Sequence, residues 1–155
     1  MAIYNAGSIV VNGVHKLLCA KFSAEMREIM VQQVSDAELQ LMKIIWGKGG
    51  TALYAQILEE LTATGNTWQK NTIITLLSRL VEKGLVKTNK IGRRNEYTAI
   101  VSEADYREMQ TKKFLDKLYE GNVRGLVATL IQGDMLTSED YEELKKYWEG
   151  RKTDE

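Results

Sequence analysis

Proline, cysteine and histidine are nearly missing from this sequence of 155 residues, which has no proline, one cysteine and one histidine. Without proline, helices are free to run uninterrupted. The single cysteine, Cys19, excludes an intrachain disulfide, and we expect a reducing, cytoplasmic environment. A Ser/His/Asp set would depend entirely on His15, and no glycine-rich loop follows a strand. An enzyme is therefore the weakest function class.

Long apolar runs and metal-ligand clusters are also lacking. No run approaches the ~20 residues that cross a bilayer, and the first twenty residues lack the basic start and apolar stretch of a signal peptide. His15 and Cys19 lie four residues apart, but two ligands do not make a metal site. We expect no metal, no cofactor and no membrane insertion.

The net charge of zero hides a polarised distribution. Residues 1–65 carry five basic and six acidic side chains, residues 66–98 carry seven and two, and residues 99–155 carry nine and thirteen. A basic middle segment attracts phosphates, which the acidic remainder repels. Contact with nucleic acid is expected in the middle segment alone; an ordinary solvated surface is the alternative.

Three helices are predicted in the first half of the chain. Ser35 and Glu38 have the spacing of a capping box ahead of apolar residues at helical intervals. Thr51 is expected to cap the second helix and Thr67 the third, and Gly84 ends the third. The predicted ranges are 36–46, 51–63 and 68–83.

After Gly84 the pattern changes from helical to extended. Residues 85–91 and 94–100 form a predicted hairpin around Gly92. Its tip is basic, and we expect Lys90, Arg93 and Arg94 to contact DNA. The order of three helices and a basic hairpin indicates a winged helix-turn-helix domain over residues 35–100, in a mainly α protein.

Three further helices are predicted between residues 101 and 150, ahead of a short tail at 151–155. They begin at Ser102, after Asn122 and at Thr137. Their apolar side chains are many for ~55 residues, which scarcely build a closed core alone. We expect dimerisation, because a second copy can cover this apolar surface. The expected dimer-interface residues are Phe114, Leu118, Leu126, Leu130, Leu144 and Trp148.

The third helix has the pattern of a recognition helix. Its apolar residues fall on one face at 100° intervals, and the opposite face carries short hydroxyls and amides that let a helix approach a groove closely. A merely solvated helix, the alternative, usually carries more Lys/Glu pairs. Ile74 suits a thymine methyl, or is an ordinary surface residue. The predicted DNA-contacting residues are Lys70, Asn71, Thr72, Ile74, Thr75, Ser78 and Arg79.

As a set, these motifs resemble the penicillinase repressors (the BlaI/MecI group) and the related copper-responsive repressors of the CopY type. The resemblance runs from about 35 to 149 and includes Ser35-Asp36-Ala37-Glu38, Ile44-Ile45-Trp46, Lys83-Gly84 and Gly92-Arg93. It implies a homodimer that represses genes of β-lactam resistance or cell-wall stress from an inverted-repeat operator. It also implies relief by a membrane-bound sensor protease that leads to a cut in the first helix after the wing.

Three departures limit what the resemblance implies. The family's Asn-Phe cleavage site corresponds to Lys113-Phe114, so the usual relief mechanism is in question. The Cys-x-Cys motifs of the copper branch are missing from residues 99–155, which contain no cysteine. Ile74 replaces a basic residue of the resistance repressors, so the operator sequence does not carry over.

Two alternatives remain open. Residues 1–34 lie outside the resemblance and are either a loosely attached extension, which we favour, or a short helix that packs on the domain or dimer. The winged helix itself is either a DNA-binding repressor domain or a protein-interaction adaptor. An adaptor has no need of a basic middle segment, which favours DNA binding.

Overall fold

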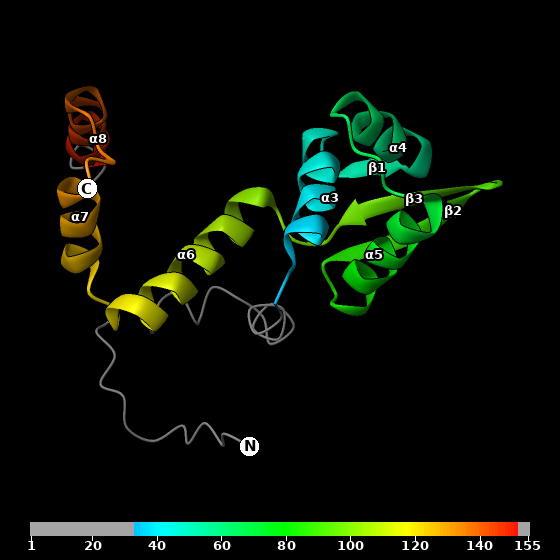
Figure 1. The fold of residues 1–155 in the computed structure, drawn as a ribbon, viewed down its shortest axis with the longest axis horizontal. Coiled ribbons are helices and arrows are strands. Elements are labelled where there is room, and N and C mark those ends of the chain that lie inside the picture. The colour runs from blue at the N-terminus through cyan, green and yellow to red at the C-terminus, as the bar shows by residue number, and fades with distance from the viewer. Residues whose placement is uncertain (1–32, 152–155) are drawn as a thin grey trace, which may run out of the picture. The chain divides into compact units, whose positions relative to one another are not determined.

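The computed structural model describes residues 33–151, which form six helices and one three-stranded sheet (Figure 1). The chain divides into two compact units, one ending at Arg107 and the other beginning at Glu108. In the described part, no helix combines the length and the apolar character needed to cross a membrane. His15 and Cys19 lie outside the described residues.

The first unit has the element order of a winged helix. Before α6 begins, the chain forms a helix, a short strand, two helices and two strands, and the hairpin formed by the last two strands extends past the helices of this unit in Figure 1. The predicted mainly α fold with a hairpin wing is confirmed. The elements are α3 (Asp36–Gly47), β1 (Thr51–Leu53), α4 (Tyr54–Ala63), α5 (Lys70–Glu82), β2 (Val86–Ile91) and β3 (Arg94–Ala99).

The sheet is antiparallel, with β3 between β1 and β2. β1 aligns Thr51 with Thr98, and the two hydroxyls are 3.1 Å apart. Thr51 therefore begins a strand, and the prediction that it caps a helix is wrong. Gly49 and Gly50, at φ of 82° and 90°, turn the chain into this strand, and α4 begins only at Tyr54.

The other helix starts follow side-chain capping with one exception. Ser35 Oγ accepts from the Glu38 backbone N–H, and the Glu38 carboxylate accepts from that of Ser35, so the predicted capping box is confirmed. The predicted start of the third helix is wrong. α5 begins at Lys70, because the Asn66 side chain accepts a hydrogen bond from the Trp68 backbone and holds that residue in a turn.

The core of the first unit lies between α3, α4, α5 and the sheet. Each of the three helices buries one apolar stripe, as the helical periodicity predicts. The sheet contributes the residues of one face, in register across β1, β3 and β2. The buried apolar residues of these elements are Leu41, Met42, Ile45, Ala52, Ile57, Leu61, Ile73, Leu76, Leu77, Leu80, Val86 and Tyr97.

The start of α6 (Glu103–Tyr119) also belongs to this core. The Trp46 indole N–H donates to the Val101 carbonyl at 2.9 Å, and the ring of Trp46 lies 5.4 Å from that of Tyr106. Val101 and Tyr106 are both buried. Burial, and then the negative charge of Glu38, raise the pKa of the Tyr106 hydroxyl. The first turn of α6 is thus fixed by contacts made within the core of the first unit.

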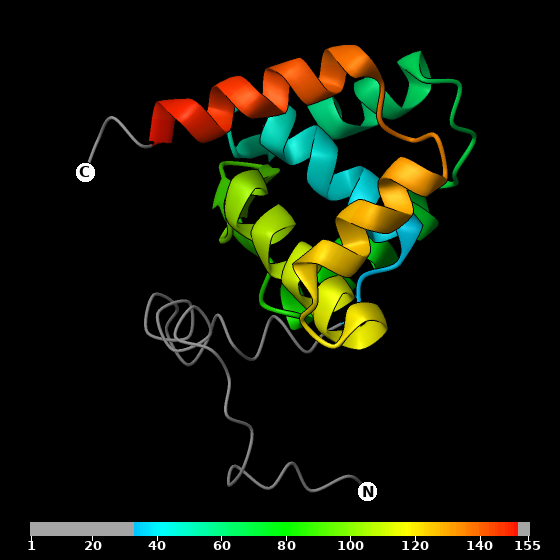
Figure 2. The ribbon, with the colours of Figure 1, turned by 90° about the vertical axis from the view of Figure 1, so that its left-hand side faces the viewer.

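The second unit contains the rest of α6, then α7 (Val123–Gln132) and α8 (Ser138–Arg151). A short connection leads from α7 into α8 (Figure 2). Asn122 caps α7, and Thr137 caps α8 through a reciprocal pair of bonds with Asp140. The bonds that the Asp140 carboxylate accepts from the Thr137 backbone N–H and hydroxyl hold the pKa of Asp140 below its ordinary value. The predicted starts of these helices are confirmed.

Trp46→Phe tests the anchor at the start of α6. We expect a decrease of about 1–3 kcal/mol in the free energy of unfolding, because the buried Val101 carbonyl is left without its donor. Trp68→Phe is the matched control, since no bond from its indole is found in the described part; it should change stability by less than about 0.5 kcal/mol. Urea denaturation of the full-length variants measures both, and equal effects would contradict the anchor.

Candidate nucleic-acid interface

Helix α5 separates its side chains into a buried and an exposed face. Its buried residues are Ile73, Leu76, Leu77 and Leu80, which is the core face that the sequence predicts. Ile74 is 39% exposed, so it stands at the edge of the outer face. All seven predicted DNA-contacting residues are exposed: Lys70, Asn71, Thr72, Ile74, Thr75, Ser78 and Arg79.

The outer face of α5 offers acceptors and methyls as well as donors. The Thr75 hydroxyl donates to the Asn71 carbonyl at 2.8 Å, so its own hydrogen is already used. Thr75 therefore presents its methyl group and an oxygen lone pair outward. Asn71 carries two donors and an acceptor, and Arg79 carries only donors. This mixture matches the varied edges of base pairs in a major groove.

The N-terminus of α5 is open. Gln69, its N-cap residue, makes no side-chain capping bond, and the first turn contains no acidic residue. Lys70 adds a positive charge at the same end. Free backbone N–H groups and the positive end of the helix dipole together favour an anion such as a DNA phosphate.

The wing carries its basic side chains at and near its tip. Ile91 pairs with Arg94 across a two-residue turn, and Gly92 has the positive φ, 62°, that the first turn position of a type II′ hairpin requires. Lys90, Arg93 and Arg94 are exposed, and within residues 33–151 none is in an ion pair of the structure. Strand alternation places Lys90 and Arg94 on opposite faces of the ribbon.

Sequence reasoning missed one basic residue of the wing, and it did not reveal that another cation of the basic segment is in an ion pair. Lys87 is exposed on β2 opposite Thr98, on the face away from buried Val86. Counting alternate residues from Val86 would have found it. Lys83 belongs to the basic segment but not to this surface, because its ammonium group pairs with Glu38 at 2.7 Å.

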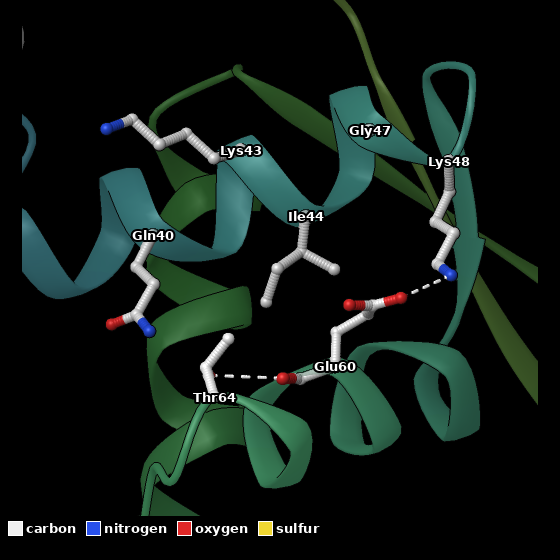
Figure 3. Close-up of a pocket in the computed structure, with 7 residues that line it drawn as sticks. All are labelled: Gln40, Lys43, Ile44, Gly47, Lys48, Glu60 and Thr64. Atoms are coloured by element: carbon white, nitrogen blue, oxygen red, sulfur yellow. Dashed lines mark hydrogen bonds and ion pairs between the residues drawn. The ribbon is translucent and has the colours of Figure 1, made fainter.

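A groove between α3 and α4 is another candidate site on this unit (Figure 3). It is open and has a volume of about 370 Å³. Lys48 and Glu60 form an ion pair at its edge, which raises the pKa of Lys48, and Ile44 points into the space between the helices. The charges of Lys48 and Glu60 offset each other, which reduces the attraction of the groove for a charged ligand. Its lining residues are Gln40, Lys43, Ile44, Gly47, Lys48, Glu60 and Thr64.

The predicted cleavage and dimer residues lie on α6, α7 and α8. Lys113 is exposed and Phe114 is 45% exposed, with its ring 6.0 Å from that of Tyr119. Leu126 and Leu130 are half-buried, while Leu118, Leu144 and Trp148 are exposed. In the described part of the chain, no group of three or more possible metal ligands is found.

Comparison with known proteins identifies the family of this chain. The model of the penicillinase repressor family matches residues 34–150. This chain belongs to the penicillinase repressor family. The match covers the whole winged helix and all three helices that follow it.

Relatives and a solved structure of the same family resemble this chain. The penicillinase repressor of Bacillus licheniformis is 37% identical over 122 residues, 79% of this chain and 94% of that protein. The methicillin resistance regulatory protein MecI of Staphylococcus aureus is 33% identical over 113 residues, covering 73% and 90% respectively. A solution structure of monomeric Bacillus licheniformis BlaI with the blaP half-operator is 41% identical, covers 49% of this chain and 90% of that chain, and has a TM-score of 0.42.

Arg93→Ala combined with Arg94→Ala tests the wing. We expect weaker binding to every duplex sequence alike, because phosphate contacts carry no sequence information. The slope of log affinity against log salt should fall by about 0.9 for each phosphate that the wing no longer neutralises. Mobility shifts at several salt concentrations measure the slope.

The matched control removes two arginines from the acidic part of the chain. Arg124→Ala with Arg151→Ala changes the net charge equally, and both residues are exposed on α7 and α8. This variant should keep the wild-type salt slope. A wing variant with unchanged affinity and slope would show that the hairpin does not touch DNA.

Proposed function

We propose that this chain is a DNA-binding transcriptional repressor that acts as a dimer on an inverted-repeat operator. The observation that carries the proposal is the exposed face of α5 beside an open helix N-terminus and an exposed basic wing, in a chain of the penicillinase repressor family. In this proposal, α5 reads base edges, and Lys90, Arg93 and Arg94 hold phosphates. Such a repressor works in the cytoplasm, where bacterial DNA lies.

Dimerisation is supported by the apolar surface of residues 108–151. No residue of α7 or α8 is buried within the single chain. Leu118, Leu144 and Trp148 are 61%, 52% and 67% exposed. Side chains of this kind gain about 1.5–3 kcal/mol each on full burial, so a second copy that covers them stabilises the pair. The proposed interface also includes Phe114, Leu126 and Leu130.

The names of two relatives indicate the class of genes that this chain regulates. They are called a penicillinase repressor and a methicillin resistance regulatory protein. We infer that this chain controls genes of β-lactam resistance or cell-wall stress. A copper switch of the Cys-x-Cys kind is not available here, because the chain's one cysteine is Cys19.

Selection of bound duplexes from a random-sequence pool by the full-length protein tests the function. A dimer with two reading heads should recover an inverted repeat whose half-sites lie about 10 base pairs apart, or a multiple of that, centre to centre. Recovery of no preferred sequence, together with salt-insensitive retention, would favour a protein-interaction adaptor.

A variant with a charged dimer surface is the control for this selection. Leu118→Glu with Leu144→Glu changes two exposed positions of the second unit and none in the winged helix. We expect a monomer by sedimentation that still binds a half-site but whose affinity for the full repeat falls about 10²–10⁴-fold, since the two heads are no longer tethered. A dimer that is unaffected would place the interface elsewhere.

Induction is proposed to cut the Lys113-Phe114 bond, in line with the resemblance to repressors that a sensor protease inactivates. The bond lies inside α6, so a protease reaches it only after local opening of the helix. One cut separates the reading head from the helices of the proposed interface. Each head then binds a single half-site weakly, and the gene is released.

Mass spectrometry of the protein from cells treated with a β-lactam checks this mechanism. We expect a fragment that ends at Lys113 to appear with derepression. Lys113→Asn, which replaces the cation with the family's amide, compares how well the sensor protease of those cells accepts each residue. Intact protein alongside full derepression would contradict cleavage and indicate a ligand or a dissociation mechanism.

A further inference from the structure

The end of the recognition helix is bonded to a buried carboxylate on α3. Glu38 is 1% exposed, and one of its oxygens, Oε2, accepts from the Ser35 backbone N–H at 2.8 Å and from Lys83 Nζ at 2.7 Å. Lys83 Nζ also donates to the Gln33 carbonyl at 2.7 Å. Lys83 thus makes two short bonds to the start of α3.

Lys83 stands where the two candidate DNA-contacting elements join. It is the C-cap of α5, and only Gly84 and Leu85 separate it from β2. Gly84 adopts a φ of 72°, and the backbone N–H of Leu85 closes the helix by bonding to the Leu80 carbonyl. The chain therefore passes from α5 into the wing within three residues.

The position of the Glu38 carboxylate is fixed by hydrogen bonds and by the packing of α3. The capping box immobilises it at the first turn of α3, and that helix packs into the core through Leu41, Met42 and Ile45. Burial alone would raise the pKa of Glu38, but the bonds from Lys83 and Ser35 and the charge of Lys83 together hold it below its ordinary value. Glu38 is therefore a carboxylate at neutral pH.

We propose that the Glu38–Lys83 pair is a positioning device for DNA recognition, which holds the end of α5, where the chain enters the wing, against the start of α3. The inference deepens the proposed function and rests on it. A buried ion pair contributes little net stability, because desolvation offsets the attraction, but it constrains direction. Lys83 is accordingly a positioning residue and not a phosphate contact.

The test replaces the pair with two apolar residues, Glu38→Met with Lys83→Met, in the full-length protein. Such a replacement usually leaves a fold intact. The probes are a duplex selected by the wild-type protein and a scrambled duplex of the same length. We expect affinity for the selected duplex to fall about two- to thirty-fold, the range by which residues that do not touch a ligand modulate its binding.

Binding to the scrambled duplex and the salt slope distinguish a positioning role of Lys83 from a direct phosphate contact. Affinity for the scrambled duplex should stay within about two-fold and the salt slope should be unchanged, because the exposed cations that meet phosphates are all retained. A slope lowered by about 0.9, with both duplexes weakened alike, would make Lys83 a phosphate contact and overturn the proposal. Wild-type affinity for the selected duplex in the double variant would also overturn it, since the pair would then only stabilise the fold.

Two further variants complete the experiment. Lys83→Arg keeps a cation within reach of Glu38 and should retain the affinity for the selected duplex. If the double variant does not fold, Lys83→Met takes its place; it removes both bonds of the lysine while Glu38 keeps its bond from Ser35, and circular dichroism establishes that it is folded. Unchanged affinity of folded Lys83→Met for the selected duplex would refute the positioning role. A wild-type protein that selects no duplex would refute the proposed function instead.

Discussion

Burial of one face of α5 is the constraint on which the candidate interface depends. Ile73, Leu77 and Leu80 are at most 1% exposed, so rotation of this helix about its axis would expose apolar surface and bury polar groups. Each buried side chain of this size contributes about 1.5–3 kcal/mol, which exceeds any single surface contact. The polar face is outward as a consequence of the core.

For contact with DNA, the net charge of this molecule matters less than which of its cations are exposed and which are in ion pairs. Lys83 and Lys48 are paired with the carboxylates of Glu38 and Glu60, which reduces what they contribute to the field outside. The wing cations are exposed on a hairpin that extends from the core. A net charge of zero therefore coexists with a locally positive surface, because the acidic excess lies in residues 99–155.

The helices were predictable wherever local chemistry decides them. Capping motifs at Ser35, Ser102 and Thr137 marked three helix starts correctly, since a cap bonds only to residues three positions on. The start of α4 was not predictable in this way. Thr51 pairs with Thr98, 47 positions away, and a strand of three residues leaves no local periodicity that would reveal it.

The exposed residues of the candidate site were predictable from the sequence, but the ion pairs around it were not. Helical and strand alternation were sufficient to find the exposed face of α5 and the basic tip, and would have found Lys87. Nothing local distinguished Lys83 from its neighbours, because its partner lies 45 positions earlier in the chain. Sequence charge counts treat every lysine as available, whereas only the fold determines which ones are already paired.

The two units differ in how far the single chain buries their apolar side chains. The winged helix buries its apolar residues within one chain, and the first turn of α6 completes that core through Trp46 and Tyr106. The helices that follow leave theirs exposed, with no buried residue in α7 or α8. In the proposed function, the winged helix binds a half-site and the helices that follow it bind a second copy, so the affinity for an operator is controlled through association. A cut in α6 or dissociation of the two copies would then lower DNA affinity while the winged helix stays folded.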